Sequence, residues 1–96
     1  MRRKSIMIRG QRFHVQRRAK VLVKRVEVDG SCDPPERKDR KILISEGLTK
    51  ERELDVFIHE MLHAAFWDLD ENAVAETATD IARALSLFYE FDSPKF

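Results

Sequence analysis

The chain has 96 residues, of which 43% are apolar and 36% are charged. This length suits one small domain with a modest core, and the composition excludes a largely disordered chain. No apolar run approaches the about eighteen residues that span a bilayer, and the basic N-terminus lacks the apolar stretch of a secretory signal. The single cysteine, Cys32, excludes an internal disulfide, so we expect a cytoplasmic protein with no membrane contact.

The net charge of +1 conceals a strong asymmetry along the chain. Residues 1 to 26 contain ten Lys or Arg and no acid, whereas residues 51 to 96 contain three Lys or Arg and eleven acids. The two halves are expected to attract each other. The basic residues between positions 2 and 25 could also bind nucleic acid, although no recognisable nucleic-acid-binding motif accompanies them.

The first 46 residues have the pattern of strands. Four segments show alternation or a high β-branched content; they are residues 5–9, 12–16, 19–28 and 41–45. Gly10-Gln11 is typical of a hairpin turn between the first two. The turn formers and two prolines of residues 29–36 predict irregular structure.

From Thr49 onward the apolar residues recur at helical spacing. A first helix is predicted from about Lys50 to about Trp67, with Thr49 at its start. Asp70 is a good N-cap for a second helix, which should end near Phe91.

The predicted fold is therefore α+β, with a single domain over residues 1–96. A small curled sheet of about four strands, antiparallel or mixed, should occupy residues 1–46. An antiparallel helix pair should occupy residues 49–91.

The first predicted helix contains His59-Glu60-Met61-Leu62-His63, an HExxH motif. Helical residues at i and i+4 project side by side, so both imidazoles can reach one metal ion. Zinc suits two imidazoles and a carboxylate, and a catalytic zinc keeps a further position for water. Glu60 would then act as the general base of peptide hydrolysis.

A third ligand is needed, and the second helix offers two candidates. Glu71 follows His63 by eight residues and shares a helical face with Val74, so it should point at the first helix. Glu76, with Asp80 one turn later, resembles an arrangement in which the acid binds zinc and the aspartate steadies a ligand histidine. We favour Glu71 and keep Glu76 as the alternative.

The segment from Lys41 to Leu85 resembles the zincin metallopeptidases. Within them it is most similar to very small HExxH proteins of phages and prophages, and more distantly to SprT-like and ImmA-like peptidase domains. Residues 30–35 match a Gly-x-Cys-Asp-Pro-Pro loop of the small phage group. The resemblance implies zinc at the two motif histidines, Glu60 as general base, preference for Glu71 as third ligand, and the host cytoplasm as location. The chain departs from SprT-like proteins in lacking a third histidine downstream, and from metzincins in lacking their Gly-containing continuation.

Several other residues are weaker candidates. In zincins an edge strand beside the cleft pairs with substrate, and Lys41 to Ser45 is the segment expected to do so. Tyr89 or His14 could stabilise the oxyanion, although surface or structural roles are the alternative. Cys32 could approach the metal as a fourth ligand and block it, or be a half-buried loop thiol. Phe66-Trp67 should pack at the hairpin end or line the cleft rim.

Three classes of function are compatible with the sequence. The leading one is a zinc metallopeptidase acting on a peptide or protein substrate. The second is a non-catalytic zinc-binding module, and the third is an accessory protein that binds nucleic acid or a partner through the basic N-terminal strands. Glu60 favours the enzyme, because a structural zinc site needs no base beside it.

Overall fold

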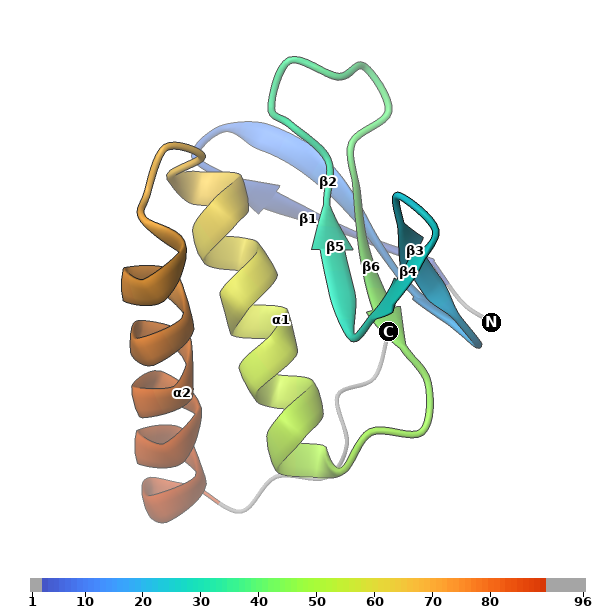
Figure 1. Ribbon diagram of the computed structural model, residues 1–96. Helices are drawn as coiled ribbons and strands as arrows, with labels where there is room; N and C mark the ends of the chain where they lie inside the picture. Colours follow the sequence, from blue (N-terminus) through green and yellow to red (C-terminus); the bar gives the residue numbers. More distant parts are fainter. Residues whose placement is uncertain (1–2, 90–96) are drawn as a thin grey trace.

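Strands precede helices along the part of the chain that this computed structural model describes, residues 3–89 (Figure 1). The elements, in chain order, are β1 Lys4–Ile8, β2 Gln11–Arg18, β3 Val21–Val23, β4 Val26–Val28, β5 Gly30–Cys32, β6 Lys41–Ser45, α1 Lys50–Ala65 and α2 Glu71–Phe88. A mixed four-stranded sheet and a separate strand pair come before the two helices. The α+β class predicted from the sequence is therefore confirmed.

The four-stranded sheet has the order β1-β2-β6-β5. β2 runs antiparallel to β1 and parallel to β6, and β5 runs antiparallel to β6. β1 and β2 are joined by Arg9 and Gly10, whose φ values of 48° and 78° are both positive, as a two-residue hairpin turn of type I′ requires. The predicted hairpin is confirmed, with its turn one residue earlier than expected because Gln11 already belongs to β2.

The prediction of a single strand over residues 19–28 is wrong. The segment is a hairpin in which β3 and β4 pair, with Val21 opposite Val28. Its turn consists of Lys24 and Arg25, both in the left-handed region with φ of 50° and 68°. Long cationic residues are unusual there, so the turn carries none of the Asn or Gly residues by which such turns are found.

The irregular structure predicted for residues 29–36 is only partly correct. Its first half forms β5, in which Gly30 and Cys32 lie opposite Ile44 and Ile42 of β6. A strand of three residues is stabilised by its neighbour rather than by its own composition. The predicted irregularity holds from Asp33 onward, where no helix or strand forms before β6.

Both helices begin at the predicted caps. The Thr49 side chain accepts a hydrogen bond from the Arg52 amide, and Asp70 accepts one from the Ala73 amide. α1 ends at Ala65, two residues before the predicted Trp67, with Phe66 as its C-cap. α2 ends at Phe88, short of the predicted end near residue 91, which lies outside the described residues.

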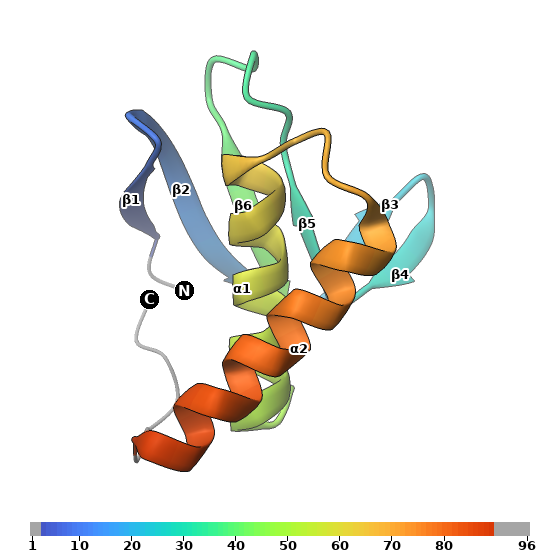
Figure 2. The same ribbon diagram turned by 90° about the vertical axis from the view of Figure 1, so that its left-hand side faces the viewer.

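The core forms between the inner face of the sheet and α1, and α2 covers the other side of α1 (Figure 1). α1 and α2 run in opposite senses and cross obliquely (Figure 2). Alternation along β2 and β6 turns one set of side chains towards α1. The fully buried members of this core are Phe13, Val15, Ile42 and Ile44 from the sheet. Val74 and Ala78 of α2 are fully buried as well.

Charged contacts fix α1 on the sheet. The Arg17 guanidinium of β2 donates to both carboxylate oxygens of Glu53, and both side chains are largely buried. Arg52 donates twice to one oxygen of Asp29, at 3.0 and 2.9 Å, just before β5. The first pair joins the basic half of the chain to the acidic half, as the charge asymmetry predicts. Among residues 3–89, no helix is both long and apolar enough to cross a bilayer.

Candidate metal centre

The two histidines of the HExxH motif lie one turn apart on α1 and converge. Their ring centroids are 4.9 Å apart, and the Nε2 atoms of His59 and His63 are separated by 3.2 Å. Both rings are part-buried, which is a consequence of their position where α1 faces the start of α2. This is the side-by-side arrangement that the i, i+4 spacing predicts.

Glu71 completes this group from the first turn of α2. One carboxylate oxygen lies 2.9 Å from His59 Nε2, and the other lies 2.7 Å from His63 Nε2. The short connection after α1 and the Asp70 cap place this residue beside the histidines. His59, His63 and Glu71 are the set we favoured from the sequence, and the structure brings them together.

The spacing of these atoms fits a zinc ion. Zinc holds nitrogen or oxygen ligands at roughly 2.0–2.1 Å in a tetrahedron, so its ligand atoms lie about 3.3 Å apart. The two imidazole nitrogens are already 3.2 Å apart, and a small outward movement of the exposed Glu71 side chain would bring its oxygen to the same spacing. One carboxylate and two imidazoles are also a donor set that catalytic zinc uses.

Glu76, the alternative ligand, lies elsewhere. It is exposed and lines a shallow surface hollow with Thr79 and Asp80. Of residues 3–89, only His59, His63 and Glu71 form a group whose ligand atoms all lie within 4.8 Å of one another. The geometry therefore supports Glu71 as the third ligand.

Glu60, next to His59 on α1, lies close to the backbone of β5 and is only 8% exposed. Burial raises the pKa of Glu60 to about 7, and the negative charge of Glu71 adds to the rise. A carboxylate with a pKa near neutrality can both accept and return a proton at physiological pH. Perturbed carboxylates of this kind are typical of functional sites.

The backbone of β5 passes unusually close to Glu60. A Cβ atom added to Gly30 would lie 3.2 Å from Glu60 Oε2 and 2.6 Å from a methyl carbon of Val56. Only glycine lets the strand approach α1 this closely. Sequence reasoning missed this role of Gly30, which entered only as part of a loop motif. Gly30 is itself the first residue of β5, and a glycine within a strand often marks such a close backbone approach.

Two small cavities lie on either side of Glu60. One, of about 140 Å³, is lined by Cys32, Glu60, His63 and Trp67. The other, of about 230 Å³, lies between the end of β4, the start of β5 and the helices, and includes His59 and Glu71 in its lining. Both therefore adjoin the candidate metal centre, with Glu60 common to the two.

Cys32 faces the smaller of these cavities but is not part of the ligand group. Burial raises the pKa of its thiol to about 12, and the charges of Glu60 and Asp33 add to the rise. Its Sγ lies 3.4 Å from the Asp33 carbonyl oxygen, to which the thiol donates. The fourth-ligand role considered from the sequence is disfavoured because the Cys32 sulfur does not lie with the ligand atoms of His59, His63 and Glu71. The alternative, a half-buried thiol, agrees with the structure.

The prediction that residues 41–45 form the edge strand that pairs with substrate is wrong. β6, residues 41–45, lies inside the sheet between β2 and β5, so both of its edges are occupied. The strand at this edge of the sheet is β5, which also lies beside Glu60. The error followed from missing β5 as a strand.

The two candidates for oxyanion stabilisation are also wrong. His14 lies on the face of the sheet opposite α1, where its ring contacts Ser5 and Asp39 at 3.0 and 3.4 Å. Tyr89 follows the last residue of α2, and Glu71 is the first. The helix of 18 residues separates them by about 27 Å. Neither side chain can reach the histidine pair.

Phe66 and Trp67 were expected at the hairpin end or the cleft rim, and Trp67 does lie at the rim. Its ring is 6.5 Å from that of His63, and it lines the smaller cavity.

Comparisons with protein-family models, with curated proteins and with solved structures found no match for this chain.

Proposed function

We propose that the protein is a zinc-dependent metallopeptidase that hydrolyses peptide bonds in a peptide or protein substrate. The observation that carries the proposal is the convergence of His59, His63 and Glu71 beside a buried carboxylate, Glu60. It is the activity that the resemblance to small zincins implies. We further propose a cytoplasmic location, that of the host if a phage encodes the protein, because its one cysteine is a free thiol.

The chain's own residues divide the chemistry between binding and proton transfer. His59, His63 and Glu71 would hold the ion, which when bound supplies polarisation of a carbonyl group and a lowered pKa of water. Glu60 accepts the proton of the attacking water and returns it to the departing amine. Its carboxylate is buried and shares a cavity with His63, which suits a proton-transfer role beside the histidine pair.

The free edge of β5 is the part of the chain best placed to orient a substrate. An extended peptide could add to this edge as a further strand. It would then pass the Glu60 carboxylate, because Gly30 brings the strand within van der Waals range of that group. Pairing through backbone atoms places few demands on substrate side chains.

A proteolysis assay tests the proposal. Zinc-loaded protein and its Glu60→Gln variant are incubated with an unfolded protein such as reduced casein, and cleavage products are identified by mass spectrometry. We expect cleavage by the parent and a loss of about 100-fold or more in Glu60→Gln. Glu76→Gln is the matched control, because the same change is made on an exposed acid outside the site. Equal cleavage by parent and Glu60→Gln would refute the assignment.

A non-catalytic zinc module remains the alternative within the same site. It has no need of Glu60, and burying this carboxylate without need would only destabilise the fold. Zinc binding that persists in a parent inactive on every substrate would favour this alternative.

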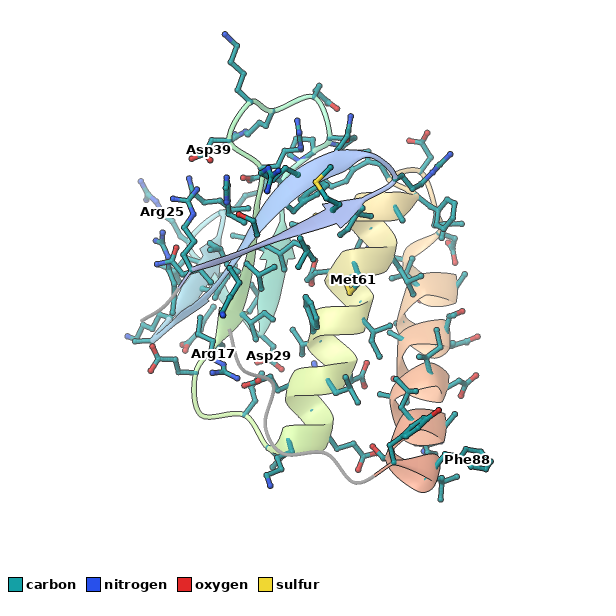
Figure 3. All side chains as sticks on the ribbon, turned by 180° about the vertical axis from the view of Figure 1, so that it is seen from behind. Arg17, Arg25, Asp29, Asp39, Met61 and Phe88 are labelled. Carbon is teal, nitrogen blue, oxygen red and sulfur yellow. The ribbon has the colours of Figure 1, made fainter. Side chains whose placement is uncertain are left out.

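A second candidate function is nucleic-acid binding by the outer face of the sheet, the face away from α1. Side chains alternate between the two faces along β2, so Arg12 and Arg18 lie on the face opposite to the buried Phe13. Neither arginine has a salt bridge with any residue from 3 to 89. Figure 3 views this side and shows nitrogen-bearing side chains over the sheet, with oxygen-bearing ones along α2. His14 is the one ring on this face of β1, β2 and β6, so contacts would be mainly to phosphates and independent of base sequence.

The test is binding of a fluorescent DNA duplex at several salt concentrations, with the double variant Arg12→Glu, Arg18→Glu. We expect affinity to fall steeply with salt and to be lost in the variant. The single variant Arg12→Glu is measured alongside, and Arg83→Glu, on the exposed side of α2, is its control of equal charge change. Absence of salt-sensitive binding in the parent would remove this candidate.

A further inference from the structure

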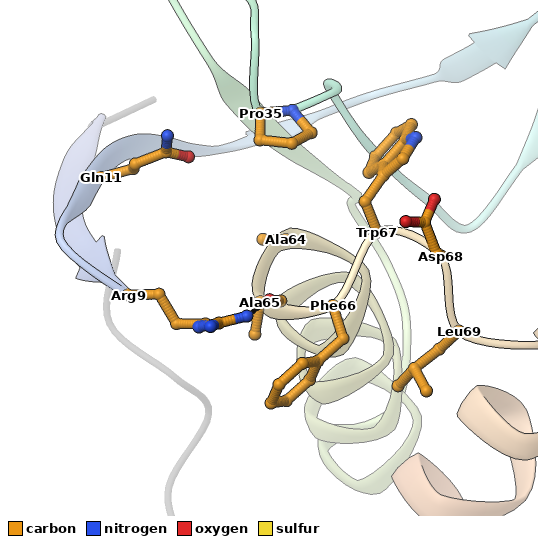
Figure 4. Close-up of a pocket in the computed structure, with 9 residues that line it drawn as sticks. All are labelled: Arg9, Gln11, Pro35, Ala64, Ala65, Phe66, Trp67, Asp68 and Leu69. Carbon is orange, nitrogen blue, oxygen red and sulfur yellow. Dashed lines mark hydrogen bonds between the residues drawn. The ribbon is translucent and has the colours of Figure 1, made fainter.

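A larger cavity, of about 520 Å³, lies at the C-terminal end of α1 (Figure 4). Three parts of the chain surround it: the β1–β2 turn, the loop between β5 and β6, and the connection from α1 to α2. Its lining residues are Arg9, Gln11, Pro35, Ala64, Ala65, Phe66, Trp67, Asp68 and Leu69.

Trp67 joins this cavity to the candidate metal centre. The same side chain lines the smaller cavity that contains Glu60 and His63. Ala64 lies next to His63 in sequence and forms part of the larger cavity, one turn beyond Glu60. A peptide whose scissile bond lies at the histidine pair could therefore place a neighbouring side chain in this cavity.

Six of the nine lining residues are apolar, the other three being Arg9, Gln11 and Asp68, and much of the lining is open to solvent. Phe66, Trp67 and Leu69 are 48%, 41% and 43% exposed, within four consecutive positions. Large apolar side chains concentrated in one exposed hollow mark a binding site more often than a free surface. Pro35 and Ala64 add further apolar surface on the other walls.

The cavity is formed before any ligand binds, because internal contacts hold its walls. Arg9 Nη1 donates to the Ala65 carbonyl at 3.0 Å, and the guanidinium lies over the Phe66 ring at 5.1 Å from its centroid. The Leu69 amide donates to the Phe66 carbonyl at 3.0 Å. Arg9 is brought there by its own left-handed conformation in the β1–β2 turn. A preformed apolar site loses little conformational entropy on binding.

We propose that this cavity, at the end of α1, binds a large apolar side chain of the substrate, such as Phe, Leu or Met, next to the bond to be cleaved. This inference rests on the proposed peptidase function for its orientation towards the histidines. The cavity itself does not depend on that function, because the described residues form it. The proposed substrate class is peptides with a bulky apolar residue, in preference to peptides with small or acidic ones.

Trp67 makes a direct binding measurement simple, because it is the one tryptophan in the sequence. The zinc-loaded Glu60→Gln variant, which should not cleave, is titrated with blocked pentapeptides that carry Phe, Leu, Ala or Asp between glycines. Tryptophan emission is followed. We expect a blue shift, and affinity for the Phe and Leu peptides at least about tenfold above that for Ala.

Leu69→Asp tests the location of binding. It places a charge in the cavity wall and should abolish the preference for Phe and Leu. Leu87→Asp is the control of the same chemical change at a site 78% exposed near the far end of α2, and it should leave the preference intact. Zinc content of each variant is measured in parallel, since neither residue belongs to the ligand group.

The outcomes separate the two proposals. A Phe and Leu preference that Leu69→Asp removes, in a protein that neither holds zinc nor cleaves, would retain the apolar site and reject the peptidase. Equal binding of the Ala and Phe peptides, no peptide binding at all, or identical effects of Leu69→Asp and Leu87→Asp would overturn the inference. Cleavage by the parent with no preference for apolar residues would also overturn it, while the peptidase function would stand.

Discussion

Replacing Gly30 with alanine should destabilise the protein through one defined clash. The new Cβ would lie 2.6 Å from Cγ1 of Val56, which is closer than real Cβ contacts allow. It would also lie 3.2 Å from Glu60 Oε2 and from the Leu43 carbonyl oxygen. Val56 is 4% exposed in the interface between α1 and the sheet, so its side chain cannot swing into solvent. Either β5 or α1 must shift.

The expected cost follows from overpacking of a filled core. Adding a methyl group to such a site costs about 1–3 kcal/mol of unfolding free energy. For a domain of this size that lowers the melting temperature by roughly 5–20 °C. The φ of Gly30 is not in the left-handed region, so the clash rather than backbone strain should account for the whole loss.

A double-mutant cycle measures the clash itself. Val56→Ala alone should cost about 2 kcal/mol through lost packing. Combined with Gly30→Ala, it provides room for the added methyl, so the double variant should be little worse than Val56→Ala alone. Urea unfolding followed by circular dichroism gives each free energy, with Ser31→Ala as the neighbouring control in β5. Additive losses in the double variant would refute the close approach of β5 to α1.

Three further predictions concern the candidate centre. In a competition titration, Glu71→Ala should weaken zinc binding by more than the roughly 10–100-fold that is lost when a residue hydrogen-bonded to a metal ligand is removed. Glu76→Ala should leave zinc affinity unchanged. A larger loss in Glu76→Ala than in Glu71→Ala would make Glu76 the third ligand. In zinc-free protein, burial raises the pKa of Glu60 from 4.5 to about 7 in the folded state. The contribution of this group to the free energy of unfolding is therefore fully present below about pH 4.5. It is lost as the pH rises to about 7, which lowers the free energy of unfolding by about 3 kcal/mol. Glu60→Gln should therefore be more stable than the parent at pH 8 and not at pH 4, and parallel pH profiles of the two proteins would contradict this. Because burial raises the pKa of Cys32 to about 12 from 9.0, iodoacetamide at pH 8 should modify the folded protein about three orders of magnitude more slowly than the unfolded one; comparable rates by mass spectrometry would show that the thiol is not buried.

Features set by local sequence were predictable. The caps at Thr49 and Asp70 depend on hydrogen bonds spanning three residues, and the convergence of His59 and His63 depends only on helical geometry. Glu71 could be favoured from its helical face alone. The short connection after α1 then brings it to the histidines.

Features set by pairing across the chain were not predictable. β5 is a strand because β6 lies beside it, and Gly30-Ser31-Cys32 carries no strand signal of its own. Missing β5 also displaced the expected substrate-binding edge to β6. The turn at Lys24-Arg25 was missed because its residues are ones that rarely adopt positive φ.

The most direct test of the central claim is metal content. Protein purified without added metal is measured by elemental analysis beside Glu60→Gln and His63→Ala. We expect about one zinc per chain in the parent and in Glu60→Gln, and its loss in His63→Ala, because both histidine nitrogens and Glu71 face one point. No metal in the parent, together with no uptake of added zinc, would show that these three residues do not form a zinc site.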